Sequence, residues 1–82
     1  MTNTQSNINE ITEDQLAFAV FCIENIAEYL NTDGKTVYDL LTVKSKILDD
    51  YILPCTDVLH TQGKSYIVND IVEYMKSKGV IQ

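Results

Sequence analysis

The segment Cys55-Thr-Asp-Val-Leu-His-Thr-Gln-Gly-Lys-Ser-Tyr-Ile-Val-Asn-Asp-Ile71 decides how the second half of the chain folds. Apolar residues recur at helical spacing on both sides of the polar string His60-Thr-Gln-Gly63, which contains the only histidine of the protein. A polar string with a glycine between two such patterns predicts a chain reversal between two helices. Gly63 is expected to end the first of these helices in a left-handed conformation.

Working outward from this segment, the same periodicity predicts helices along the whole chain and no strand. Thr12 and Gln15 fit a capping box, in which each side chain bonds the backbone N–H of the other residue. The apolar period continues in phase through Pro54, so we expect a kinked helix there rather than a new helix that begins at the proline. The predicted helices span residues 13–30, 34–42, 47–61 with a kink near Pro54, and 65–78. The fold class is therefore all-α, a compact bundle of four helices.

The first predicted helix is apolar almost all round in its front half. Its expected core stripe follows the three- and four-residue spacing of a buried helix face. The stripe consists of Leu16, Val20, Ile23, Ala27 and Leu30, and it is widened by Ala19, Cys22 and Ile26. Phe18 and Phe21 do not fit that stripe, and Phe21 shares its side with polar residues. Two interpretations remain open. The two rings are apolar anchors for a partner or a dimer, or the helix is central and the other helices surround it.

The chain has 82 residues, which is the size of one small domain. Residues 1–10 are polar and lack periodicity, so we expect a flexible N-terminal tail, followed by a single helical domain over residues 11–82. A domain of this size buries a modest share of its surface and gains stability from a partner or from self-association.

Charge and composition narrow the classes of function. The net charge is −6 and every basic residue is a lysine, so bidentate recognition of phosphate or guanine by arginine is excluded. The lysines are scattered along the sequence, and we expect no binding of nucleic acid. The longest apolar run, residues 16–23, is too short to cross a bilayer, so we expect no membrane association and a cytoplasmic location. Cys22 and Cys55 are expected to be buried, reduced thiols, with a disulfide as the alternative.

The polar string between the last two helices carries more hydrogen-bonding side chains than a chain reversal requires. In the functional interpretation, His60, Thr61, Gln62 and Tyr66 form a recognition cluster for a protein partner. In the structural interpretation, the same side chains only satisfy backbone groups at the helix ends. A third interpretation is a polar small-ligand or enzymatic site at Asp57, His60 and Gln62, because a carboxylate three residues before a histidine on a helix can orient the imidazole.

Catalytic and metal-binding signatures are absent from the sequence. It contains no serine elbow and no glycine-rich phosphate loop. One histidine with two widely separated cysteines does not match the spacing of a zinc site. We therefore predict no catalytic residues, no metal and no cofactor, and we prefer a non-enzymatic role while the question of an enzymatic site stays open.

Five segments together resemble a family of short bacterial proteins. They are Val20-Phe-Cys-Ile-Glu24, Val37-Tyr-Asp-Leu-Leu41, Leu48-Asp-Asp-Tyr-Ile52, Asp57-Val-Leu-His-Thr-Gln-Gly63 and Tyr66-Ile-Val-Asn-Asp-Ile71. On these segments the chain resembles the 3791 family of proteins of unknown function, over roughly residues 16–79. The resemblance implies a helical protein encoded beside a small ADP-ribosyltransferase-like protein, in an arrangement similar to a toxin and its neutralising or accessory partner.

The residues and the resemblance together predict a small, acidic, non-enzymatic protein-interaction module. It is expected to be antitoxin-like, or accessory to a neighbouring ADP-ribosyltransferase-like protein. The expected partner-binding residues are those of the recognition cluster, His60, Thr61, Gln62 and Tyr66. Phe18 and Phe21 are the expected apolar anchors. The partner is a protein, such as the product of the adjacent gene, or a second copy of the chain. The alternatives are the polar site around Asp57, His60 and Gln62 and, less favoured, a helix-turn-helix regulator built from the last two helices.

Overall fold

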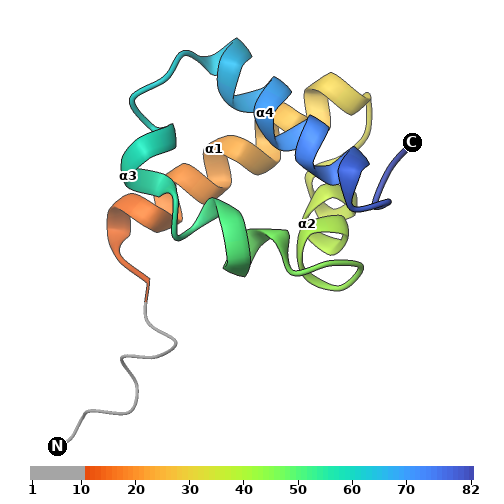
Figure 1. Ribbon diagram of the computed structural model, residues 1–82, viewed down its shortest axis with the longest axis horizontal. Coiled ribbons are helices and arrows are strands. Elements are labelled where there is room, and N and C mark those ends of the chain that lie inside the picture. The colour runs from red at the N-terminus through yellow and green to blue at the C-terminus, as the bar shows by residue number, and fades with distance from the viewer. Residues whose placement is uncertain (1–10) are drawn as a thin grey trace, which may run out of the picture.

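The computed structural model describes residues 11–82, and all the regular structure in this range is helical. Figure 1 shows the helices in chain order: α1 Glu13–Leu30, α2 Gly34–Thr42, the π-helix η2 Leu48–Ile52, α3 Thr56–Leu59 and α4 Lys64–Ser77. The all-α class is confirmed, and the bounds of α1, α2 and α4 agree with the sequence prediction to within one residue. The described range holds five helical segments where four were expected. The predicted flexible tail, residues 1–10, lies outside the described residues.

The first two helices begin at side chains that accept backbone hydrogen bonds. The hydroxyl of Thr12 accepts from the N–H of Gln15 at 3.0 Å, and the amide oxygen of Gln15 accepts from the N–H of Thr12 at 2.9 Å. This is the predicted capping box. Helix α1 ends at Asn31, whose φ of 59° is left-handed, and the carboxylate of Asp33 then accepts the N–H of Thr36 at 2.8 Å to begin α2.

The third predicted helix is divided at Pro54 into η2 and α3, so the expectation of one kinked helix over residues 47–61 is wrong. Proline has no N–H to donate to the preceding turn. Just before it, the N–H of Leu53 donates to the carbonyl of Leu48 at 2.9 Å, which is the wide spacing of a π-helix. Helix α3 begins only at Thr56, after Cys55 has left the helical region with ψ near 11°.

The reversal before α4 differs from the expectation for Gly63. This glycine has φ −73° and ψ 161°, which is extended backbone, and it precedes α4 as its N-cap. The predicted left-handed conformation at Gly63 is therefore wrong, because the turn is made earlier, where the N–H of Gln62 donates to the carbonyl of Leu59 at 2.9 Å. The left-handed glycine is Gly79, with φ 75°, which follows α4.

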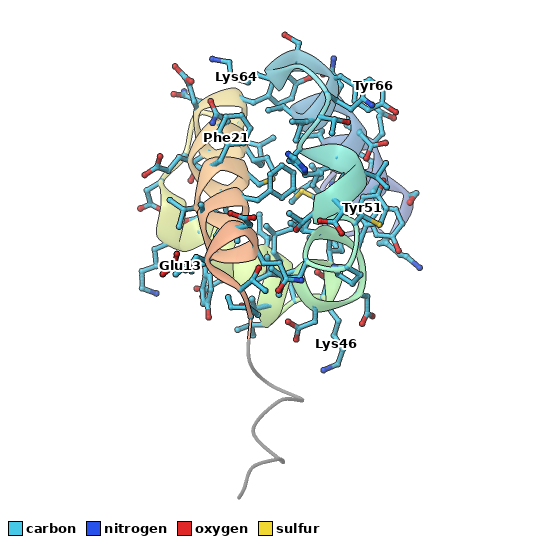
Figure 2. All side chains as sticks on the ribbon, turned by 90° about the vertical axis from the view of Figure 1, so that its left-hand side faces the viewer. Glu13, Phe21, Lys46, Tyr51, Lys64 and Tyr66 are labelled. Atoms are coloured by element: carbon cyan, nitrogen blue, oxygen red, sulfur yellow. The ribbon has the colours of Figure 1, made fainter. Side chains whose placement is uncertain are left out.

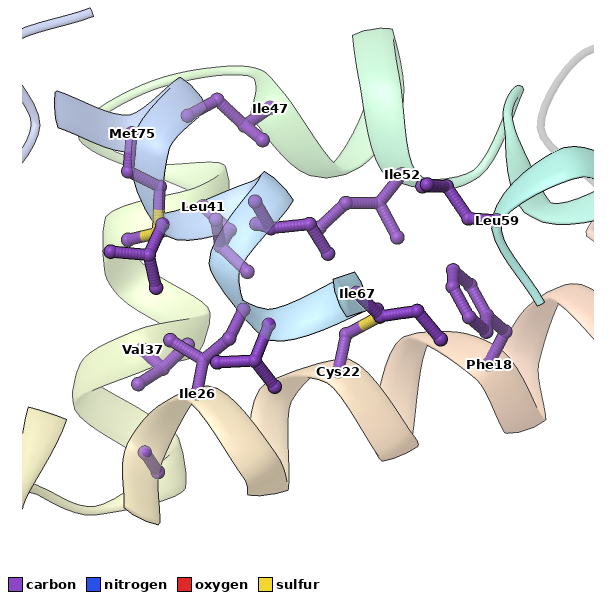
Figure 3. Packing of buried hydrophobic residues seen from close by; sticks show 14 residues of the cluster. Phe18, Cys22, Ile26, Val37, Leu41, Ile47, Ile52, Leu59, Ile67 and Met75 are labelled. Carbon is purple, nitrogen blue, oxygen red and sulfur yellow. The ribbon is translucent and has the colours of Figure 1, made fainter. Parts of the chain in front are cut away.

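The core lies between α1, α2 and α4, and the divided third segment closes it (Figure 3). Helix α1 contributes Phe18, Ala19, Cys22, Ile26 and Ala27. This face follows the residues expected to widen the stripe, Ala19, Cys22 and Ile26, whereas Leu16 is 53 % exposed and Val20 is 45 % exposed. The reason is the position of α2, which approaches the later turns of α1, where Ile23 lies against Gly34. Leu16 and Val20 precede that contact and stay uncovered.

Candidate functional site

The link between α3 and α4, residues 60–63, lies at one end of the molecule (Figure 1). Its backbone is hydrogen-bonded to the preceding helix: the N–H of His60 donates to the carbonyl of Thr56 at 2.9 Å. The hydroxyl of Thr61 donates to the carbonyl of Val58 at 2.8 Å, so this side chain serves the helix end, as the structural interpretation holds. The side chains of His60 and Gln62 are exposed, and neither has a hydrogen bond to another residue in the range 11–82.

A cleft of about 320 Å³ lies beside His60, and we call it the His60 cleft. It is lined by Asp14, Ala17, Phe18, Thr56, Asp57 and His60. Two residues of the predicted polar site, Asp57 and His60, thus border one cleft, whereas Gln62 does not. Two carboxylates and one imidazole around a small apolar floor can bind a polar or cationic group.

A second cleft, of about 380 Å³, lies where α1 meets the start of α4, and we call it the Tyr29 cleft. It is lined by Asn25, Glu28, Tyr29, Lys64, Ser65, Val68 and Asn69. The link therefore runs between the two clefts, with His60 at one and Lys64 at the other. Both clefts share the same face of α1, because residues 14, 18, 25 and 28 follow the spacing of adjacent helical turns.

The two phenylalanines on this face of α1 differ from each other in burial. Phe18 is only 7 % exposed and belongs to the core, so the interpretation that it lies off the core face is wrong. Its neighbour Phe21 is half-buried against the core. In the sequence it falls between Phe18, which lines the His60 cleft, and Asn25, which lines the Tyr29 cleft. The two ring centroids are 6.2 Å apart and the ring planes differ by 19°. Figure 2 views the side of the molecule where Phe21, Lys64 and Tyr66 lie. Phe21 is thus the ring that remains partly exposed.

Tyr66 stands in the first turn of α4 and is 55 % exposed. It borders neither cleft. Val58, on α3, is 67 % exposed, so the end of the molecule around the link presents apolar as well as polar side chains. The predicted role of Tyr66 in binding a partner stays a prediction.

The described residues offer little for covalent chemistry. Burial raises the pKa of the Cys22 thiol to about 12, which keeps it protonated at neutral pH. Both cysteines are free thiols, and Cys55 is only partly buried. Within residues 11–82, no group of three or more His, Cys, Asp and Glu side chains is placed to hold a metal ion. In the same range, no helix combines the length and the apolar character that crossing a membrane requires.

Residues 17–78 match the family described as protein of unknown function (DUF3791). The chain belongs to this family. The DUF3791 region extends from the first turns of α1 to just beyond α4, so it includes the link and most residues of both clefts. No curated protein and no solved structure matches the chain.

Several residues that border the clefts were missed by sequence reasoning, notably Asp14, Asn25, Tyr29 and Lys64. A signal was present, because Asp14, Phe18, Asn25 and Glu28 share one helix face. The sequence analysis noted only that Phe21 shares its side of the helix with polar residues. Only the packing of α3 and α4 against α1 shows that it lies opposite the link.

Proposed function

We propose that this member of the DUF3791 family is a non-enzymatic protein-interaction module that contacts its partner with the end of the molecule around the link. The observation that carries the proposal is the pair of exposed side chains, His60 and Gln62, that have no hydrogen bond to another residue in the range 11–82, at a link bordered by two clefts on α1. We call this region the link surface, defined as Phe21, His60, Thr61, Gln62 and Tyr66. A small domain with such a surface gains stability when a partner covers it.

The chemistry of the link surface suits a partner that is basic and carries an apolar anchor. Asp14 and Asp57 border the His60 cleft and Glu28 borders the Tyr29 cleft, so carboxylates lie on both sides of Phe21. The chain carries a net charge of −6, which favours encounter with a basic protein. The family resemblance suggests the product of the adjacent gene, an ADP-ribosyltransferase-like protein, as this partner. In that case the role is antitoxin-like or accessory.

Co-expression with the adjacent gene product, followed by calorimetric titration, tests the proposal. We expect a complex of the two proteins, weakened about tenfold or more by His60→Ala or Tyr66→Ala, as for residues that carry interface energy. Tyr38→Ala is the matched control, because Tyr38 is a 50 % exposed tyrosine on α2. If the protein stays a free monomer beside that product, or if the Tyr38 and Tyr66 variants lose the same affinity, the proposal is wrong.

A second candidate is a small polar ligand in the His60 cleft, favoured by the presence of Asp57 and His60 on one cleft wall. An NMR screen of small cationic and polar compounds should then shift His60 and Asp57 signals, and Asp57→Asn should abolish those shifts. A screen without such shifts would remove this candidate. The helix-turn-helix alternative has weaker support, because α3 is only four residues long.

A further inference from the structure

At the end of α4, a third cleft gathers lysines that are scattered in the sequence. This lysine cleft has a volume of about 330 Å³, and its lining includes Lys44, Lys46, Lys78, Tyr74 and Asp50. Three of the six lysines of the protein therefore meet around one cleft. Figure 1 shows that the end of α4 lies near α2, at the end of the molecule opposite α3 and the link. The sequence separates residues 44–46 from Lys78, and the fold brings them together.

The positive charges of this cleft are not neutralised by ion pairs in the described part of the chain. The ion pairs there are Lys35 with Asp39, at 3.5 Å, and Lys76 with Glu73, at 3.6 Å. Neither involves a lysine of the cleft. Three ammonium groups and one carboxylate, that of Asp50, thus make a locally positive site on a protein whose net charge is −6. A cleft lined mainly by one sign of charge focuses the field and concentrates ions of the opposite sign.

One of the three lysines is held in place by an aromatic stack. The rings of Tyr51 and Tyr74 are stacked with centroids 4.4 Å apart, and the ammonium of Lys78 lies 5.5 Å from the centroid of the Tyr74 ring. The hydroxyl of Tyr51 donates to the carboxylate of Asp70 at 2.5 Å, which fixes the stack to α4. The Tyr51 ring and the Lys78 ammonium both lie against the Tyr74 ring. The cleft therefore offers positive charge rather than a free aromatic ring on which a base could stack. A pre-positioned charge also lowers the entropy cost of binding.

We propose that the lysine cleft binds a compact oxyanion with several negative charges, such as a phosphate or pyrophosphate group. Lysine binds phosphate as a point charge, so three lysines that line one cleft can hold such an ion without any arginine. The cleft volume is at the lower end of the range for small-ligand sites, which fits a small anion. This site is separate from the link surface and does not depend on the proposed interaction with a protein.

An NMR titration of the full chain with pyrophosphate, at constant ionic strength in potassium chloride, tests this inference. We expect amide shifts concentrated at residues 44–47, Tyr74 and Lys78. Lys46→Ala should weaken binding about tenfold, the loss of one charge-assisted contact. Lys64→Ala is the matched control, because it changes the net charge equally but lines the distant Tyr29 cleft. A parallel titration with citrate separates phosphate recognition from recognition of any compact polyanion.

Binding of pyrophosphate alone, or of both anions, at these residues supports an oxyanion site and identifies its preference. Two results would overturn it. One is a pyrophosphate titration of the unmodified chain that gives no shifts at the lysine cleft. The other is a Lys64→Ala variant that loses as much affinity as Lys46→Ala, since the attraction would then depend on overall charge alone.

Discussion

Asp33 is a single carboxylate that begins α2, and its hydrogen bond to the N–H of Thr36 links helix stability to pH. The hydrogen bonds from Thr36 hold the pKa of Asp33 below its usual value of 3.8. A lowered pKa in the folded state means that the stabilising contribution is present at neutral pH. It is lost in acid, as the pH falls from the ordinary pKa through the lowered value.

Asparagine can still cap the helix but does not titrate. We therefore predict that Asp33→Asn makes the free energy of unfolding depend less on pH in the acid range. Urea unfolding of both proteins from about pH 7 to about pH 3 would measure this difference. The difference in the free energy of unfolding that favours the native protein over the variant should become smaller as the pH falls. Asp49→Asn serves as a control, since Asp49 is exposed and has no hydrogen bond to a backbone N–H in the described residues. A constant difference between the Asp33 proteins at all pH values would contradict the prediction.

The two thiols differ because only one of them is inside the core. Cys22 is fully buried and its pKa is raised to about 12 by burial, whereas Cys55 is partly buried. At about pH 8 a thiol with that pKa is ionised in only about one molecule in ten thousand. We expect a disulfide reagent such as dithionitrobenzoate to modify Cys55 in the native protein and Cys22 only after unfolding. Cys55→Ser should then show no reactive thiol under native conditions, and rapid reaction of that variant would show that Cys22 is accessible.

At the scale of elements, Gln15 joins the start of α1 to the break at Pro54. Its amide oxygen completes the capping box with Thr12, and its amide nitrogen donates to the carbonyl of Leu53 at 3.1 Å. The break before α3 thus has one of its carbonyls satisfied by a residue 38 positions earlier. Gln15, which caps the start of α1, thus also stabilises the break between η2 and α3.

Gln15→Glu separates these two roles. Glutamate keeps the capping box but has no N–H to donate to Leu53, so we expect a loss of about 1 kcal/mol in the free energy of unfolding, the value of one hydrogen bond. Gln15→Ala removes both interactions and should cost about 2 kcal/mol. Chemical denaturation measures both values. Equal stability of the glutamate variant and the native protein would show that the bond to Leu53 contributes nothing.

At the scale of the whole molecule, net charge opposes the folded state. The chain carries −6, and the ion pairs of the described residues are two exposed contacts within one helix each. Such contacts contribute little to stability. The small core must therefore overcome mutual repulsion among carboxylates.

We predict that the melting temperature rises by a few degrees as sodium chloride increases from about 10 mM to about 200 mM, because the screening length falls from about 30 Å to below 10 Å. Glu24→Gln, at an exposed position of α1, should reduce this salt response by removing one negative charge. A melting temperature that stays constant or falls with salt would show that attraction between charges outweighs repulsion. Thermal unfolding followed by circular dichroism provides the measurement.

The sequence alone determined the helices α1, α2 and α4 and the capping box of Thr12 and Gln15. These features depend on hydrogen bonds and apolar spacing within a turn or two, so the chain near each residue is sufficient to predict them. Tertiary structure decided which face of α1 is buried, where the third helix breaks, which side chains border the clefts, and that three lysines converge. Those outcomes depend on which distant segment covers a surface, and neither the rotation of a helix nor its neighbours can be read from local periodicity.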